Sequence, residues 1–322
     1  MKIHGLCLVK NEVDILQETL LAALPWCDHI YVFDNGSNDG TWELVNKLSQ
    51  RHQQIVPYKQ DSILYTNSLR ADIFNAFRAN AGPQDWWCGL DADEFYIDDP
   101  RLFLTKVADR FHTVWSASLN YYFTDEDAIL YRKDPVKFLE TPIQQRLRYY
   151  RNNWGELRFF RHSDDIVWTS DQEGGYPWAM FTAAAYPVRI WLKHYQYRSP
   201  EQIERRLRTR RPAIQARTGF WHEGKPDWSN TVAAKKDAPL DFDDSDPEFA
   251  VSRWEERIVP AASLDYDAFD RRYVVNEDLM PEFPIRVRHS RLKAMIPQPI
   301  RARLGRLRRQ MLPMFGQPQP SR

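Results

Sequence analysis

The chain has 322 residues, enough for one large domain or two modest ones. Charged residues make up 27% and hydrophobic residues 43%, as in an ordinary soluble protein. The formal net charge of zero is unevenly spread, because residues 286–322 contain ten Lys and Arg and no acid. No apolar run is long enough to span a membrane. The basic segment lacks a nucleic-acid-binding motif, so we expect no nucleic-acid partner.

The three cysteines lie far apart in apolar stretches, without the spacing of a zinc site or of a disulfide framework. We therefore expect a reducing compartment. Residues 1–9 are too short an apolar stretch for a signal peptide, and charged residues follow at once. Together these features predict a cytoplasmic protein.

Strands and helices alternate along the first hundred residues. Apolar runs predict strands at 2–9, 29–33, 55–58 and 86–90. Amphipathic stretches predict helices that begin after Asn11 as an N-cap, near Trp42, and over 68–79. This alternation predicts a parallel sheet with right-handed crossovers.

Polar residues follow three of these strands and should meet at one edge of the sheet. They are Asn11 and Glu12 after the first strand, Asp34 after the second, and Asp91 and Asp93 after the fourth. Asp91 and Asp93 are two apart, so on a regular strand they share a face. Paired carboxylates repel each other unless a cation lies between them, and a divalent ion that bridges to phosphates is the usual cation. The plainer interpretation is a helix cap, an ordinary turn and a solvated strand end.

The alternation stops after residue 99. Strands are predicted at 114–123 and 188–195, with two more inside 145–161 that form a hairpin around 152–155. Ser199, Pro200 and Gln202 predict a helix start. Elements are weakly marked beyond residue 211. The predicted domains are a catalytic domain at 1–211, with halves at 1–99 and 100–211, a helical or irregular extension at 212–285, and a basic tail at 286–322.

Four motifs in order resemble the GT-A-fold glycosyltransferases of the family-2 type, in the bacterial branch related to families 2 and 92. They are CLVKNEVDIL, VFDNGSNDGT, GLDADEFYI and LKHYQYRSPEQ, and they span roughly residues 3–211. The resemblance implies an α/β fold with a mixed, Rossmann-like sheet flanked by helices. It also implies metal-dependent transfer of a sugar from a nucleotide-diphosphate donor to a hydroxyl, with inversion at the anomeric carbon.

Residue roles follow from the resemblance by position. Asp34 matches the acid that contacts the nucleobase and ribose. Asp91 and Asp93 match the Asp-x-Asp motif that holds Mn²⁺ or Mg²⁺ on the diphosphate, and His194 matches a histidine that completes the metal shell. The nucleotide-binding candidates are Asn11, Glu12, Asp34 and Asp91. We expect a UDP-sugar as donor and a cell-surface glycan or a lipid-linked glycan as acceptor.

The acceptor hydroxyl needs a general base. The Glu-Asp pair followed by a QxxRW motif, found in processive family-2 enzymes, is missing from the sequence. We predict Asp171, because it precedes a Gly-rich loop and lies shortly before the His194 strand. The alternatives are Glu173, Asp125, Glu126 and Asp127.

Several features of the sequence are compatible with two interpretations. His194 ends an apolar strand, so it either binds the metal or accepts a hydrogen bond in the core. The arginines near position 200 either face a diphosphate or form a solvated helix face; they are Arg198, Arg205, Arg206 and Arg208. Residues 286–309 interleave basic and apolar side chains, which predicts peripheral contact with an anionic membrane. The alternative functions are a non-catalytic carbohydrate- or nucleotide-binding protein, and a phosphatase that uses the strand-end aspartates.

Overall fold

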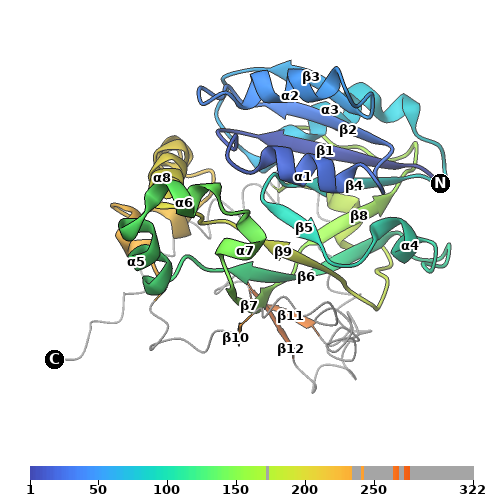
Figure 1. The fold of residues 1–322 in the computed structure, drawn as a ribbon. Helices are drawn as coiled ribbons and strands as arrows, with labels where there is room; N and C mark the ends of the chain where they lie inside the picture. The colour runs from blue at the N-terminus through green and yellow to red at the C-terminus, as the bar shows by residue number, and fades with distance from the viewer. Residues whose placement is uncertain (172–173, 234–240, 243–263, 268–271, 276–322) are drawn as a thin grey trace.

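The computed structural model describes residues 1–171, 174–233, 241–242, 264–267 and 272–275. Its first half is a parallel sheet in the order β4–β1–β2–β3 (Figure 1). The strands are β1 (Ile3–Val9), β2 (His29–Asp34), β3 (Ile55–Gln60) and β4 (Trp86–Leu90). Every residue of β1 and β4 is buried, as expected for strands covered on both faces.

Helices cover both faces of this parallel part. The helices are α1 (Leu16–Ala23), α2 (Thr41–Ser49) and α3 (Arg70–Phe77), with short 3-10 turns η1 (Asn67–Leu69) and η2 (Arg78–Asn80) beside α3. Leu20 of α1 and Val45 of α2 share one core cluster, whereas Ile73 of α3 belongs to a second. The two clusters lie on opposite faces of the sheet.

The second half extends the sheet with antiparallel strands. The new strands are β5 (Glu94–Tyr96), β6 (Thr113–Tyr121), β7 (Tyr149–Trp154), β8 (Leu157–Arg161), β9 (Ile190–His194) and β10 (Asp241–Phe242). β8 joins β4 to β6, and β9 runs parallel to β6 while it pairs with β5. A separate pair is formed by β11 (Leu264–Asp267) and β12 (Arg272–Val275). The predicted mixed α/β sheet flanked by helices is confirmed.

Short helices connect the strands of the second half. They are α4 (Pro100–Leu104), α5 (Asp125–Lys133), α6 (Pro135–Glu140), α7 (Ile143–Arg146), η3 (Trp178–Phe181), η4 (Trp221–Glu223) and η5 (Trp228–Thr231). No helix in the described ranges is long and apolar enough to cross a bilayer. Glu173 and the basic tail at 286–322, with its predicted membrane-binding part at 286–309, lie outside the described residues.

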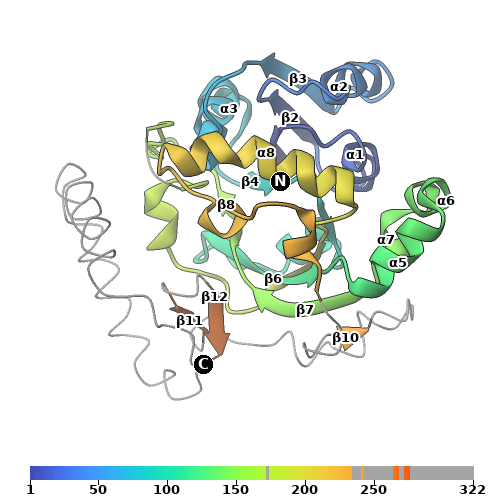
Figure 2. The same cartoon turned by 90° about the vertical axis from the view of Figure 1, so that its left-hand side faces the viewer.

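Helix α8 (Pro200–Gln215) lies across the carboxyl ends of the parallel strands (Figure 2). The Ser199 side chain accepts a hydrogen bond from the Gln202 backbone N–H, so the predicted helix start is confirmed. Ile203 and Leu207 anchor the helix in a core cluster. The helix continues through the predicted domain boundary at residue 211.

Two local predictions are wrong. The strands β7 and β8 do not form a hairpin, because β6 lies between them and pairs with both. Asn11 is not the N-cap of α1, which begins at Leu16. Asn11 instead has a left-handed φ of 58°, and its side-chain oxygen accepts a hydrogen bond of 2.9 Å from the Asn38 backbone N–H. It therefore fastens the loop after β1 to the loop after β2.

Candidate active site

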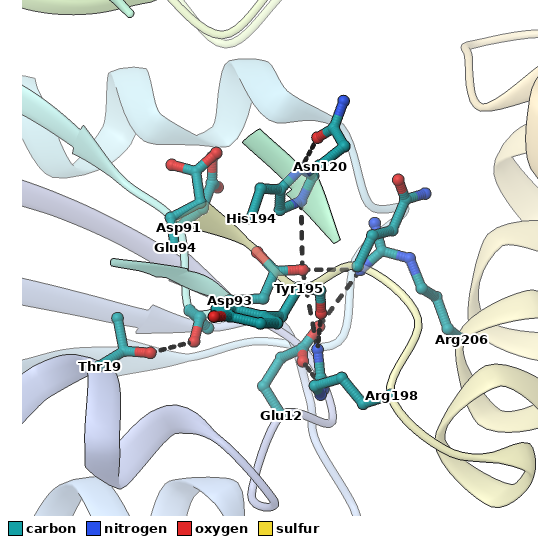
Figure 3. Close-up of polar contacts among 12 residues, drawn as sticks. Glu12, Thr19, Asp91, Asp93, Glu94, Asn120, His194, Tyr195, Arg198 and Arg206 are labelled. Atoms are coloured by element: carbon teal, nitrogen blue, oxygen red, sulfur yellow. Dashed lines mark hydrogen bonds and ion pairs between the residues drawn. The ribbon is translucent and has the colours of Figure 1, made fainter. Parts of the chain in front are cut away.

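The register between β5 and β9 brings Asp93 and His194 together. Glu94 is paired with His194 across the two strands, and the Tyr195 N–H donates to the Asp93 carbonyl at 2.8 Å. The Asp93 Oδ2 and His194 Nε2 atoms are 3.6 Å apart (Figure 3). The other ring nitrogen, Nδ1, donates to Asn120 Oδ1 at 2.8 Å because that amide oxygen can only accept. Nε2 is therefore the nitrogen that faces Asp93.

Two arginines of the α8 segment also reach Asp93. Arg206 Nη1 lies 3.3 Å and Arg198 Nη1 3.8 Å from Asp93 Oδ2. Burial alone would raise the pKa of Asp93, but His194, Arg206 and Arg198 hold it well below its usual range. Burial alone would lower the pKa of His194, but the Asp93 carboxylate raises it above its ordinary value. Asp93 is thus a charged carboxylate surrounded by cations.

Arg198 connects this group to the loop after β1. It is fully buried, and it pairs with both carboxylate oxygens of Asp14 at 2.8 and 2.9 Å and with Glu12 Oε2 at 2.5 Å. The second Glu12 oxygen lies 3.6 Å from Arg206 Nη1. Burial raises the pKa of Glu12 despite these arginines. Glu12, predicted to contact nucleotide, therefore lies beside Asp93 and within the arginine network.

Asp91 belongs to a different group. Its two oxygens accept from Arg70 and, at 2.7 Å, from Arg158, both of which are buried. Arg158 also pairs with Glu94, and burial raises the pKa of Glu94 to about 8. Burial would raise the pKa of Asp91 as well, but its two arginines lower it. β4 ends at Leu90, so the prediction that Asp91 and Asp93 share a strand face is wrong (Figure 3).

Asp34 lies fully buried at the carboxyl end of β2, as predicted. Its Oδ1 accepts from the Ser37 N–H at 2.7 Å and from Gln60 Nε2 at 3.3 Å. Its Oδ2 has no hydrogen-bond partner among the residues described. Lys10 Nζ is nearby and donates to the Asn35 carbonyl at 2.9 Å. An orphaned buried carboxylate oxygen is costly in the protein alone and is suited to a ligand hydroxyl or N–H.

The candidate bases among the described residues are Asp171 and three acids of α5. Asp171 lies in an exposed turn, where it accepts a hydrogen bond from the Thr169 hydroxyl. Asp127 completes a capping box with Thr124 at the start of α5, and burial raises its pKa to about 6. Asp125 and Glu126 occupy the first turn of the same helix. The role of Asp171 as base stays a prediction.

Of the three predicted metal ligands, the structure brings Asp93 and His194 together. In the described part of the chain, no three His, Cys, Asp or Glu side chains gather as a metal site. One carboxylate oxygen and one imidazole nitrogen nevertheless face each other, and Asn120 holds the imidazole from behind. Such an outer hydrogen bond is typical of metal-binding histidines. Asp93 raises the pKa of His194, so a metal ion at Nε2 would compete with a proton for that nitrogen.

Sequence reasoning missed Arg70 and Arg158. A signal existed for Arg70, because it lies three residues before Ile73 and seven before Phe77, on the apolar side of its helix. Arg158 lies in the strand LRFFR, whose five residues are all buried. Because buried and exposed residues do not alternate there, the hydrophobic pattern could not single out Arg158 as a buried arginine.

The comparisons with known proteins gave solved glycosyltransferase structures. PcManGT, a mannosyltransferase from Pyrobaculum calidifontis in complex with GDP-Man and Mn²⁺, is 14% identical over 66% of this chain and 64% of its own, with a TM-score of 0.39. S. aureus TarS is 13% identical over 66% of this chain and 40% of its own, with a TM-score of 0.35. GalNAc-T7 with UDP, GalNAc and Mn²⁺ is 12% identical over 66% and 48%, with a TM-score of 0.39.

This chain therefore spans less than two thirds of the length of each of these three structures. No family model matches the chain, and no curated protein matches it.

Proposed function

We propose that the chain is a glycosyltransferase of the GT-A fold and the family-2 type that moves a sugar from a nucleotide-diphosphate donor, a UDP-sugar, to a hydroxyl of a glycan or lipid-linked acceptor. The observation that supports the proposal is the set of side chains that meet at one edge of the sheet. There, Asp34 has an orphaned buried oxygen, and Asp93 and His194 face each other beside Arg206 of α8. A ligand hydroxyl or N–H would find a partner in Asp34, and an anionic ligand would find one in Arg206.

Asp34 recognises the nucleoside in this proposal. Its Oδ1 is fixed by the Ser37 N–H, which leaves Oδ2 to accept a hydrogen bond from a ribose hydroxyl or a base N–H. Asn11 acts indirectly, because it holds the loop after β2 through Ser37 and Asn38. Glu12 and Asp91 act through their arginines, since each carboxylate is already paired with one or two guanidinium groups.

Asp93 and His194 would hold Mn²⁺ or Mg²⁺. When bound, such an ion neutralises the charge that develops on a departing diphosphate. Arg206 supplies a second positive charge at the same place, because its Nη1 already lies 3.3 Å from Asp93 Oδ2. Asp171 is our proposed base for an inverting transfer, with Glu173, Asp125, Glu126 and Asp127 as alternatives. A cytoplasmic location and contact of residues 286–309 with an anionic membrane complete the proposal.

A donor panel tests this function. Thermal shift and nucleotide release are measured with UDP- and GDP-sugars, with and without Mn²⁺. We expect one donor to raise the melting temperature only with metal, since binding stabilises the folded state by mass action. Asp93→Asn should abolish this shift and turnover, whereas Asp165→Asn, which changes an exposed acid, should not. Full activity of Asp93→Asn, or undiminished turnover in a chelator, contradicts the proposal.

A further inference from the structure

Glu223 is a buried carboxylate that belongs to none of the four sequence motifs. It lies in η4 and is 1% exposed. Its Oε1 accepts from Arg206 Nε and from Gln196 Nε2, both at 2.7 Å, and its Oε2 lies 3.2 Å from Arg210 Nε. Burial alone would raise the pKa of Glu223, but Arg206 and Arg210 lower it to about 2. The protein therefore keeps a full negative charge at this buried position.

The bond from Glu223 fixes the orientation of Arg206. A guanidinium is planar, so an acceptor held at Nε determines where the two terminal nitrogens point. In Arg206, Nη1 lies 3.3 Å from Asp93 Oδ2 and 3.6 Å from Glu12 Oε1 (Figure 3). Without the acceptor at Nε, this long side chain could take other rotamers along α8.

Arg206 differs from Arg198 in how its charge is balanced. Arg198 is fully buried and bonded to both oxygens of Asp14 as well as to Glu12, so its bonding capacity is used inside the protein. Arg206 is 13% exposed in its side chain, and its contacts with Asp93 and Glu12 are longer. Arg206 Nη1 is therefore the nitrogen that can exchange a carboxylate for an oxygen of an incoming anion.

We propose that Glu223 is a positioning residue for the donor diphosphate: it holds Arg206 so that the terminal nitrogens of the guanidinium meet the diphosphate oxygens beside Asp93. This inference rests on the proposed function. It adds a residue from a segment that follows α8 and connects that segment to substrate binding. Arg210 shares Glu223 but stacks on the rings of Tyr65 and Phe220 at 4.0 and 4.1 Å, which identifies it as a packing contact.

The test compares ligands that differ only in the diphosphate. Titration calorimetry with Mn²⁺ measures Kd for UDP against uridine, and for GDP against guanosine. We expect Glu223→Gln to weaken binding of the diphosphate about three- to tenfold, because the charge that anchors Arg206 is lost, and to leave nucleoside binding unchanged. Arg206→Lys should do the same. Glu201→Gln, an exposed acid on α8, is the matched control and should change neither Kd.

A double-variant cycle separates positioning from general stability. Arg206→Lys combined with Glu223→Gln should bind the diphosphate no more weakly than Arg206→Lys alone, because both changes remove one contact. The inference is overturned if the losses of affinity in the two single variants add up in the double variant. It is also overturned if Glu223→Gln weakens nucleoside and diphosphate binding equally, or leaves diphosphate binding unchanged. If Glu223→Gln does not fold, unchanged binding in Arg206→Lys alone overturns it. If the wild type binds neither UDP nor GDP, the proposed function falls and this inference with it.

Discussion

Removal of the Arg198 guanidinium should destabilise the whole sheet. Arg198 is fully buried, bonds to Glu12 and Asp14, and donates to the Tyr195 carbonyl at 3.0 Å. Breaking a buried ion pair costs about 3–5 kcal/mol, because the remaining charge loses its compensation. The Asp14 side chain is 29% exposed, so water can solvate it in part. We therefore expect Arg198→Met to cost about 3 kcal/mol, at the low end of that range.

Urea unfolding at pH 7 gives the free energy directly from the midpoint and slope. The matched control is Arg208→Met, because Arg208 lies exposed on α8, the helix that follows Arg198, and we expect it to cost less than about 0.5 kcal/mol. Burial alone would raise the pKa of Asp14, but the ion pair with Arg198 outweighs burial and lowers this pKa below the ordinary 3.8. The contribution of this pair is therefore present at neutral pH and lost on acidification, so the gap between wild type and Arg198→Met should narrow below pH 4.

A compensated variant checks the cause. Glu12→Gln and Asp14→Asn, added to Arg198→Met, remove the two carboxylate charges that Arg198 compensates, and they should restore at least half of the lost stability. The reasoning is refuted if Arg198→Met lies within about 1 kcal/mol of the wild type, or if the triple variant is no more stable than the single one.

Three further predictions concern other buried groups. Asp34→Ala should weaken nucleoside and nucleotide binding alike by about 1.5–3 kcal/mol, the value of a charge-assisted hydrogen bond, as measured by calorimetry. Burial lowers the pKa of His4 from 6.5 to about 4. Between pH 6.5 and pH 4, His4 is therefore protonated in the unfolded chain and neutral in the folded protein. Stability should then fall by up to about 3 kcal/mol from pH 7 to pH 4, and His4→Phe should remove part of this dependence. Gly89→Ala should cost about 1–3 kcal/mol in urea unfolding, because its Cβ would lie 2.2 Å from the Tyr176 hydroxyl.

The parallel half of the sheet was predictable because its signals are local. Asp85 and Asp91 bound an apolar run of five residues, and β4 covers those five residues. The pairing of β7 and β8 was not local. Both strands lie close in the sequence, which favours a hairpin, yet each pairs with β6, whose paired residues precede theirs by 29 to 47 positions. A strand inserted from elsewhere in the chain leaves no local signal.

The residues of the candidate site also divide into those with a local sequence signal and those without one. Asp34 and Asp93 follow strands, so their place at one sheet edge was predictable from the alternation. Their partners were not, because Arg158 reaches Asp91 across 67 positions and Arg198 reaches Glu12 across 186. Local sequence patterns do not encode contacts of that range. Asn11 failed as an N-cap for a related reason, since its side chain bonds a loop 27 residues away.

The long-range arginines have a consequence for synthesis of the chain. Asp93 and Arg206 are 113 residues apart. At a translation rate of 5–20 residues per second, Arg206 is made about 6–23 s after Asp93. During that interval the parallel strands and their helices can already collapse, while Asp93 and Glu12 still lack the arginines that later pair with them. These two carboxylates therefore lack their compensating arginines until the α8 segment is made.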